Sequence, residues 1–142
     1  MSNRTEVKYA KNVIGLMSGT SIDGIDAAFL KTDGLLHVET GEAITIPYGV
    51  DLRKTLSELV SSGKQSKTVE EQITVKHAEV ISQLLKKTNT ALVEIDLIGF
   101  HGHTIYHKPA QRKTLQIGDG DLLAQLTGVE VVCDFRSNDV KH

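Results

Sequence analysis

The sequence predicts an α/β protein whose mixed sheet opens with an antiparallel hairpin and is flanked by helices. Two apolar runs, at 13–17 and 24–30, are joined by a short polar turn, as in a β-hairpin. Apolar residues then recur at helical spacing through 50–62 and 68–87. From residue 97 onward, short apolar runs alternate with one more helical segment. Strands that alternate with helices favour an α/β layer with a mixed sheet.

The first half of the chain predicts three antiparallel strands followed by two helices. Residues 1–11 are polar with mixed charge, and we expect them to form a flexible leader. After the hairpin, β-prone residues at 35–38 and 42–47 predict a further strand or two. The first helix ends at a Ser-Ser-Gly sequence, and Thr68 with Glu71 three residues later predicts a capping box at the start of the second.

The second half predicts three more strands around a short helix. The strand at 97–100 is expected to run out into a polar loop that extends to residue 109. A strand at 114–117 precedes a helix at 121–126, with Asp119 or Asp121 as its cap. The last strand is predicted at 129–135.

Composition excludes several classes of protein. A chain of 142 residues is long enough for one domain with its own core. The net charge of −2 gives no reason to expect a nucleic-acid or membrane surface. A single cysteine, Cys133, excludes an internal disulfide framework, and the polar N-terminus lacks the apolar core of a signal peptide. We therefore expect a cytoplasmic protein.

The turn between the first two strands has the composition of a phosphate-binding turn. Gly19 and Gly24 allow a positive φ and let backbone N–H groups approach an anion. Hydroxyl donors lie beside them at Ser18, Thr20 and Ser21. The alternative is an ordinary glycine-rich hairpin turn with no ligand.

Two further groups of polar residues follow strands, where α/β sheets place ligands. Imidazoles at His101, His103 and His107 are spaced so that they form either a zinc site or the hydrogen-bonding groups of a substrate loop. Asp134 and Arg136 are two residues apart and would project from one face of a strand, where they form either a structural salt bridge or part of a ligand site.

Three motifs together resemble one family. MSGTSIDGID, HGHTIYHKP and TLQIGDGDLLAQLTGVEVVCDFRSNDV occur in this order and resemble the anhydro-N-acetylmuramic acid kinases over residues 13–140. The resemblance implies a ribonuclease-H-like fold of the actin-like ATPase type, with residues 12–142 as its N-terminal lobe. It also implies an ATP- and Mg²⁺-dependent kinase that opens 1,6-anhydro-N-acetylmuramic acid with water and forms the 6-phosphate during peptidoglycan recycling.

The resemblance assigns residues to two sites. The phosphate-binding residues would be Ser18, Gly19, Thr20, Ser21, Asp23 and Gly24. The sugar-binding residues would be His101, Gly102, His103, Thr104, Asp134 and Arg136. No metal ligand is assigned, because Leu16 stands where related kinases often carry an aspartate near Mg²⁺.

The sequence departs from the family in three places. His103 stands where the family usually has glutamine, and Ser137 and Asn138 stand where it has an arginine-rich segment. The family's general base would lie beyond His142, so we expect the C-terminal lobe and the catalytic base to be missing and the chain alone to be inactive. A homodimer or a separately encoded C-terminal half would be its partner. The alternatives are a non-catalytic phosphate-binding half-module and a histidine-ligated metal hydrolase.

Overall fold

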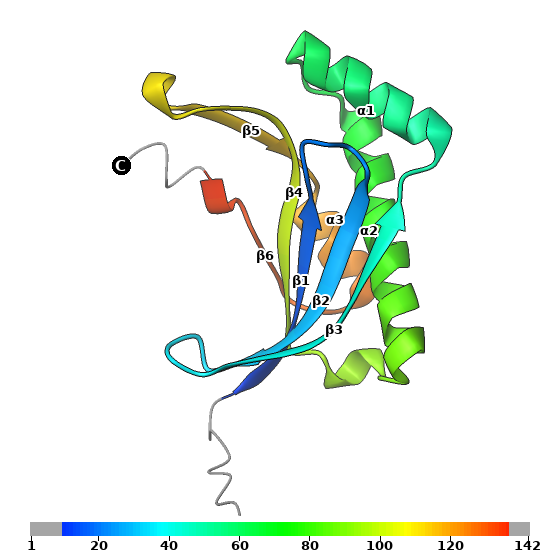
Figure 1. Cartoon of the computed structure of the whole chain (residues 1–142), viewed down its shortest axis with the longest axis vertical. Helices are drawn as coiled ribbons and strands as arrows, with labels where there is room; N and C mark the ends of the chain where they lie inside the picture. Colours follow the sequence, from blue (N-terminus) through cyan, green and yellow to red (C-terminus); the bar gives the residue numbers. More distant parts are fainter. Residues whose placement is uncertain (1–9, 137–142) are drawn as a thin grey trace, which may run out of the picture.

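A computed structural model of the chain describes residues 10–136 as a six-stranded sheet with three helices (Figure 1). Two single-turn 3₁₀ segments, η1 and η2, flank the fourth strand. The elements are β1 Lys11–Ser18, β2 Gly24–Thr32, β3 Val38–Pro47, α1 Val50–Ser62, α2 Lys67–Thr88, η1 Leu92–Glu94, β4 Leu97–Lys108, η2 Pro109–Gln111, β5 Lys113–Ile117, α3 Gly120–Thr127 and β6 Val131–Cys133. Most of the expected leader lies outside the described residues, but Lys11 already belongs to β1 and pairs with Thr32.

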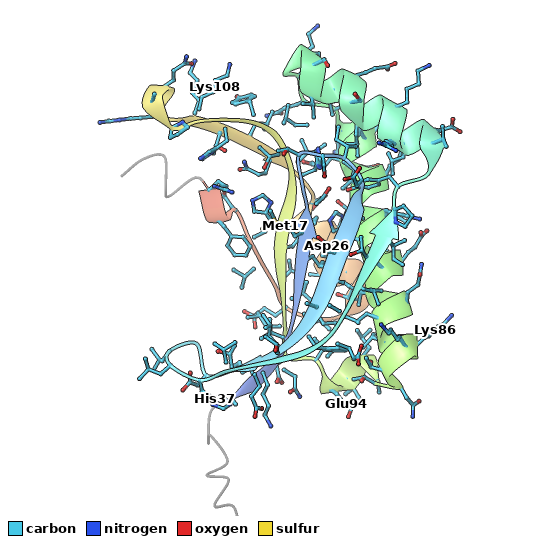
Figure 2. All side chains as sticks on the ribbon, viewed as in Figure 1. Met17, Asp26, His37, Lys86, Glu94 and Lys108 are labelled. Atoms are coloured by element: carbon cyan, nitrogen blue, oxygen red, sulfur yellow. The ribbon has the colours of Figure 1, made fainter. Side chains whose placement is uncertain are left out.

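The sheet is mixed, with the predicted antiparallel opening. β1, β2 and β3 form an antiparallel meander, and β4 lies beside β1 in the parallel direction. One half of β4 pairs with β6 in parallel, and the other half forms an antiparallel hairpin with β5. Lys108 marks the far end of β4, next to the tip of this hairpin (Figure 2).

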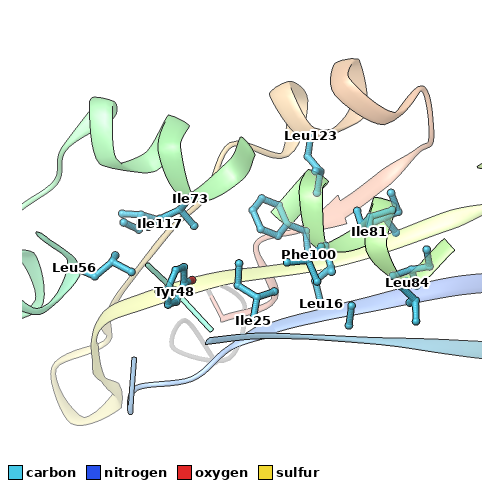
Figure 3. Close-up of a cluster of buried hydrophobic side chains, with 14 of the residues drawn as sticks. Leu16, Ile25, Tyr48, Leu56, Ile73, Ile81, Leu84, Phe100, Ile117 and Leu123 are labelled. Carbon is cyan, nitrogen blue, oxygen red and sulfur yellow. The ribbon is translucent and has the colours of Figure 1, made fainter. Parts of the chain in front are cut away.

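All three helices pack on one face of the sheet. Leu16 of β1 points into the core together with Phe100 of β4, and α2 contributes Ile73 and Leu84 (Figure 3). Ile14 of β1 is also buried in this core. Burial alternates along β1, as expected for a strand with one covered face. The opposite face carries Met17 and Val132, which are 43% and 41% exposed, so the described residues leave this face partly open.

The capping hydrogen bonds identify the residues at which α2 and α3 begin, and the capping motif in the sequence is correct for only one of them. Ser66, not Thr68, caps α2, because the Ser66 hydroxyl accepts from the Val69 N–H at 3.3 Å and Thr68 lies inside the helix. Asp119 caps α3 by accepting from the Leu122 N–H at 3.0 Å. The predicted capping box of Thr68 and Glu71 is therefore wrong, whereas one of the two predicted caps of α3 is confirmed.

Three predicted strand boundaries are wrong. The segment 35–38 is largely a turn, in which the Asp33 carboxylate accepts hydrogen bonds from the N–H groups of Leu35 and His37. The segment that was expected to be a loop, up to residue 108, continues β4 because it pairs with β5. The last strand ends at Cys133, and Asp134 then adopts a left-handed φ of 64°. Asp134 and Arg136 therefore do not share a strand face.

No helix among residues 10–136 is both long enough and apolar enough to cross a bilayer.

Candidate functional site

The turn that joins β1 and β2 is exposed and carries hydrogen-bond donors. It is closed by one hydrogen bond, from the Ile22 N–H to the Gly19 carbonyl at 3.1 Å. Thr20 and Ser21 lie at the surface, and within residues 10–136 neither their amides nor their hydroxyls have a hydrogen-bond partner. The turn thus offers two amides and two hydroxyls to an anion in solvent.

The backbone strain of this turn lies at Ile22. Its φ is 58°, which is rare for a β-branched residue, and its side chain is buried. The expectation of a positive φ at Gly19 and Gly24 is wrong, since neither is among the glycines with positive φ. Gly24 is needed for a different reason: a Cβ there would collide with the Ile46 carbonyl of β3.

The charge of the turn is partly balanced by α1. The Asp23 carboxylate lies 3.7 Å from the Arg53 guanidinium, and both side chains are mostly exposed. An exposed pair of this kind adds little to stability. It places one cation beside the turn, where it offsets the repulsion between Asp23 and an incoming anion.

Ser18 differs from its neighbours because its hydroxyl lies beneath the turn. Ser18 is 1% exposed, and its Oγ lies 2.6 Å from Tyr48 Oη and 2.7 Å from His103 Nδ1. Its hydroxyl is therefore engaged inside the protein, and only the backbone of Ser18 faces the turn.

A β-bulge in β4 separates the histidines. Leu16 pairs with Phe100 but Ser18 pairs with His103, so β4 holds one residue more than β1 over this interval. Gly102 absorbs the extra residue with a φ of 76°, and a Cβ there would collide with the Ile117 carbonyl. The bulge turns His103 into the core and leaves His101 half-exposed.

His101 lies beside a cavity at the end of the sheet. The Arg136 Nε–H donates to His101 Nε2 at 3.2 Å, and His101 Nδ1 donates to the Gly102 carbonyl at 3.2 Å. The cavity has a volume of about 240 Å³. Its lining includes His101, Gly102, Thr114, Gln116 and Asp134.

The zinc-site interpretation is wrong for the described residues. His103 is bonded to Ser18, and His107 Nδ1 lies 3.0 Å from the Thr114 hydroxyl. Residues 10–136 contain no group of three His, Cys, Asp or Glu side chains placed to hold a metal ion. The bulge is the physical reason, because it directs neighbouring imidazoles into different layers.

Burial controls the protonation of the interior histidines. It lowers the pKa of His77 to about 4, and it also lowers the pKa of His103, with a smaller contribution from His101. His77 Nδ1–H donates to the Ile73 carbonyl at 2.8 Å, and its ring meets Phe100 edge-on. Neither His77 Nε2 nor His103 Nε2 has a hydrogen-bond partner among the described residues.

Comparison with known proteins decides the family. The family model of anhydro-N-acetylmuramic acid kinase matches residues 11–142. The chain belongs to this kinase family. Three relatives named anhydro-N-acetylmuramic acid kinase are similar to it. The relative from Paramagnetospirillum magneticum is 46% identical over 89% of this chain. Those from Agrobacterium fabrum and Rhizobium etli are 41% and 37% identical, each over 93% of this chain. The matched region spans only 36% to 38% of the length of these relatives.

The structure brings the predicted residues of this kinase-family chain into two groups. Thr20, Ser21 and Asp23 share the exposed turn. His101, Gly102 and Asp134 line the cavity, and Arg136 joins them through His101. His103 belongs to the interior beneath the turn, and Thr104 accepts a hydrogen bond from Gln116 at 3.4 Å. Ser137 and Asn138 lie outside the described residues.

Sequence reasoning missed four residues of these groups: Tyr48, Arg53, Thr114 and Gln116. Thr114 and Gln116 had a usable signal, because they alternate along a strand that follows the histidine motif. Tyr48 and Arg53 had none, since only the folding of the β3–α1 connection and of α1 beside the turn brings them near.

Proposed function

We propose that this chain supplies the phosphate-binding turn and one wall of the sugar cleft of a kinase that acts on 1,6-anhydro-N-acetylmuramic acid. In the proposed reaction, water opens the anhydro ring, ATP phosphorylates the freed O6, and N-acetylmuramic acid 6-phosphate is formed for peptidoglycan recycling. The observation that carries the proposal is the exposed turn with unpaired donors at Thr20 and Ser21, in a chain of this family.

We infer a ribonuclease-H-like fold of the actin-like ATPase type. Its support is the strand order β3-β2-β1-β4-β6. In this order β2 is antiparallel to both β3 and β1, whereas β4 is parallel to β1 and β6 is parallel to β4. The β4–β5 hairpin is then an excursion from this five-stranded core. On this proposal, residues 12–142 form the N-terminal lobe.

The turn fits the phosphates of ATP. Thr20 and Ser21 provide backbone and hydroxyl donors, and Arg53 adds a nearby positive charge. ATP would supply the phosphoryl group for transfer to the sugar. The turn fits Mg²⁺ less well, because Asp23 is its only carboxylate and the described residues hold no metal cluster. We propose that Mg²⁺ is carried by the phosphates and by water.

The cavity beside His101 suits an amino sugar that carries a carboxylate. Thr114 and Gln116 offer neutral hydrogen-bonding groups, and Arg136 offers a guanidinium near the opening. Attack by water requires a general base, which the family resemblance assigns to no residue of this chain. We propose that the base comes from protein outside residues 1–142, as a C-terminal half or a further part of the enzyme.

Ligand binding tests the first part of this proposal. We expect ATP with Mg²⁺ to raise the melting temperature of the chain, because a ligand that binds only the folded state stabilises it. Combined Thr20→Ala and Ser21→Ala substitutions should weaken ATP binding by about tenfold. Thr40→Ala, on an exposed part of β3, serves as the matched control. An unchanged ATP affinity in the double variant would contradict the assignment of the turn.

A second measurement tests the sugar wall. Binding of 1,6-anhydro-N-acetylmuramic acid should weaken by about tenfold in Arg136→Gln, since a charged hydrogen bond is lost. The chain alone, given both ligands, should bind them without turnover. Sustained release of sugar phosphate would contradict the proposal that the base lies elsewhere. Binding of ATP without any sugar binding would favour the alternative of a non-catalytic phosphate-binding half-module.

A further inference from the structure

Three side chains form a buried hydrogen-bonded chain beneath the turn. Tyr48 lies between β3 and α1, Ser18 ends β1, and His103 belongs to β4. Tyr48 Oη lies 2.6 Å from Ser18 Oγ, which lies 2.7 Å from His103 Nδ1. The three residues are 6%, 1% and 0% exposed. We call this chain the Tyr48–Ser18–His103 relay.

The relay connects both ends of the turn. Ser18 immediately precedes Gly19, at the start of the turn. At the other end, the Tyr48 backbone N–H donates to the Asp23 carbonyl at 3.4 Å. One tyrosine thus contacts the first strand through its hydroxyl and the last turn residue through its amide. The position of Thr20 and Ser21 between these contacts depends on both.

The direction of the hydrogen bonds follows from the donors that each group owns. If Tyr48 donates to Ser18 and Ser18 donates to His103 Nδ1, both hydroxyl protons are used and only His103 Nε2–H lacks a partner among the described residues. The reverse direction leaves both the Tyr48 O–H and the His103 Nε2 lone pair without a described partner. The first arrangement satisfies more groups, so it has the lower energy.

We propose that His103 is a positioning residue for the turn at 19–23, and that it fixes the Ser18 hydroxyl only while its ring is a neutral Nε2–H tautomer. The inference rests on the phosphate-binding role proposed above for this turn. A purely apolar side chain would suit this fully buried position, which pairs with Ile117 of β5, better than an imidazole with an unpaired nitrogen. The bond from Nδ1 to Ser18 explains why an imidazole stands there.

Protonation of His103 works against this bond. A second N–H appears at Nδ1, so Ser18 loses its acceptor and the relay must reverse. The ionisable groups around the ring are His77 from α2, His101 on β4 and, through Ser18, Tyr48. The Glu70 carboxylate of α2 accepts from the Gly118 N–H at 3.1 Å, one residue beyond Ile117, which pairs with His103. Burial lowers the pKa of His103, so the neutral ring dominates at neutral pH and is lost only in acid.

The tautomer of His103 is open to direct measurement. In ¹⁵N–¹H NMR spectra of the histidine rings near neutral pH, about pH 7.5, we expect a protonated Nε2 and a bare Nδ1 for His103. His77 is an internal contrast, because its Nδ1–H donates to the Ile73 carbonyl and requires the opposite tautomer. An Nδ1–H tautomer at His103 would overturn the proposed direction of the relay.

Two substitutions of His103 distinguish a role in positioning the turn from a role in core packing. His103→Asn keeps an acceptor, because its Oδ1 takes the place of Nδ1, whereas His103→Leu fills the core without one. As the pH falls, the amide resonances of residues 19–22 should shift with the titration of His103, and both variants should abolish that shift. Ser18→Ala should abolish it as well, which keeps the test open if a His103 variant does not fold. His107→Asn, on the same strand but outside the relay, is the matched control.

ADP binding connects the relay to the proposed function. Near neutral pH, His103→Asn should bind ADP within about twofold of the parent and His103→Leu about fivefold more weakly, as one neutral hydrogen bond is lost. If the amide resonances of residues 19–22 shift with pH in His103→Asn as they do in the parent protein, the positioning role is overturned, even if ADP binds. If neither the parent nor its variants bind ADP, but the turn amide resonances of the parent shift with the titration of His103, the phosphate assignment fails and the positioning role stands.

Discussion

The histidines of this protein differ in burial and in hydrogen-bond partners, although they are the same residue type. His77 and His103 lie in the core as neutral rings, whereas His101 and His107 lie nearer the surface with different partners. The sequence alone placed the three imidazoles of 101–107 in one polar loop. It could not separate them, because the separation comes from the single extra residue in β4.

The buried His77 makes stability depend on pH. An unfolded histidine takes up a proton near pH 6.5, but burial lowers the pKa of His77 to about 4 in the folded state. The free energy of unfolding is therefore highest above pH 6.5 and falls as the pH drops towards 4. Chemical denaturation should show a loss of about 2 kcal/mol between about pH 7.5 and pH 5.

A substitution at the same position provides the control for this pH dependence. His77→Leu removes the titrating group and keeps an apolar side chain against Phe100. We expect a shallower fall in stability towards acid, with the remaining slope due in part to His103. A slope equal to that of the parent protein would show that His77 contributes nothing.

At the scale of elements, the helices and the opening hairpin follow from pattern, and the ends of strands do not. The helix at 50–62 has the predicted bounds, β5 begins one residue earlier than predicted, and α3 is longer by one residue at each end. The strand predicted from Leu35 and Leu36 is wrong, because both side chains are exposed in a turn held by Asp33. β4 was predicted too short because its outer half is polar and is a strand only through its pairing with β5, which the polar residues gave no reason to expect.

The β4 bulge depends on Gly102. Its φ of 76° is unfavourable for a residue with a Cβ, and a Cβ would also collide with the Ile117 carbonyl. We expect Gly102→Ala to lower the free energy of unfolding by more than about 2 kcal/mol. Gly49→Ala is the matched control, since its φ is −63° and a Cβ there meets open space. Equal effects of the two substitutions in urea denaturation would contradict this account.

The start of α2 allows a clean comparison of two hydroxyl residues. Ser66→Ala removes the side chain that accepts from the Val69 N–H and should cost about 1 kcal/mol. Thr68→Ala changes an exposed residue inside the first turn and should be close to neutral. Thermal or urea denaturation of both variants distinguishes them. A larger effect at Thr68 would restore the capping box that the sequence pattern indicated.

At the scale of the whole molecule, the sequence predicts the fold class and the order of the sheet's opening, and the family follows from the three motifs. The proximity of the phosphate-binding turn and the cavity beside His101 is harder to predict from the sequence. The turn lies at the end of β1 and the cavity at the bulge of β4, and these become neighbours only because β1 and β4 pair in parallel. No local periodicity encodes a pairing between residues 85 positions apart, such as Ser18 and His103.

Among residues 10–136, the face of the sheet away from the helices is partly open, and this predicts association. Met17, Val132 and Phe135 are each more than 40% exposed on the side away from the helices, and the Phe135 ring lies beside Gly99. The sedimentation coefficient of the chain should therefore rise with concentration. Combined Met17→Gln and Val132→Thr substitutions should reduce this rise. Leu36→Gln, which alters a 99% exposed side chain in the β2–β3 turn, should leave it unchanged.

The irregular pairing of β1 and β4 has a consequence for how this region tolerates sequence change. Deleting Gly102 would equalise the number of residues in the two strands here, and His103 would still face the core while His101 faced away. An extra residue in β1 between Leu16 and Ser18 would also remove the mismatch, but it would bring both imidazoles to the same face. Conservative replacements keep the two imidazoles on opposite faces of the sheet, whereas one inserted residue in β1 does not. The faces of the two rings thus depend on the difference in length between the strands more than on the chemical character of either.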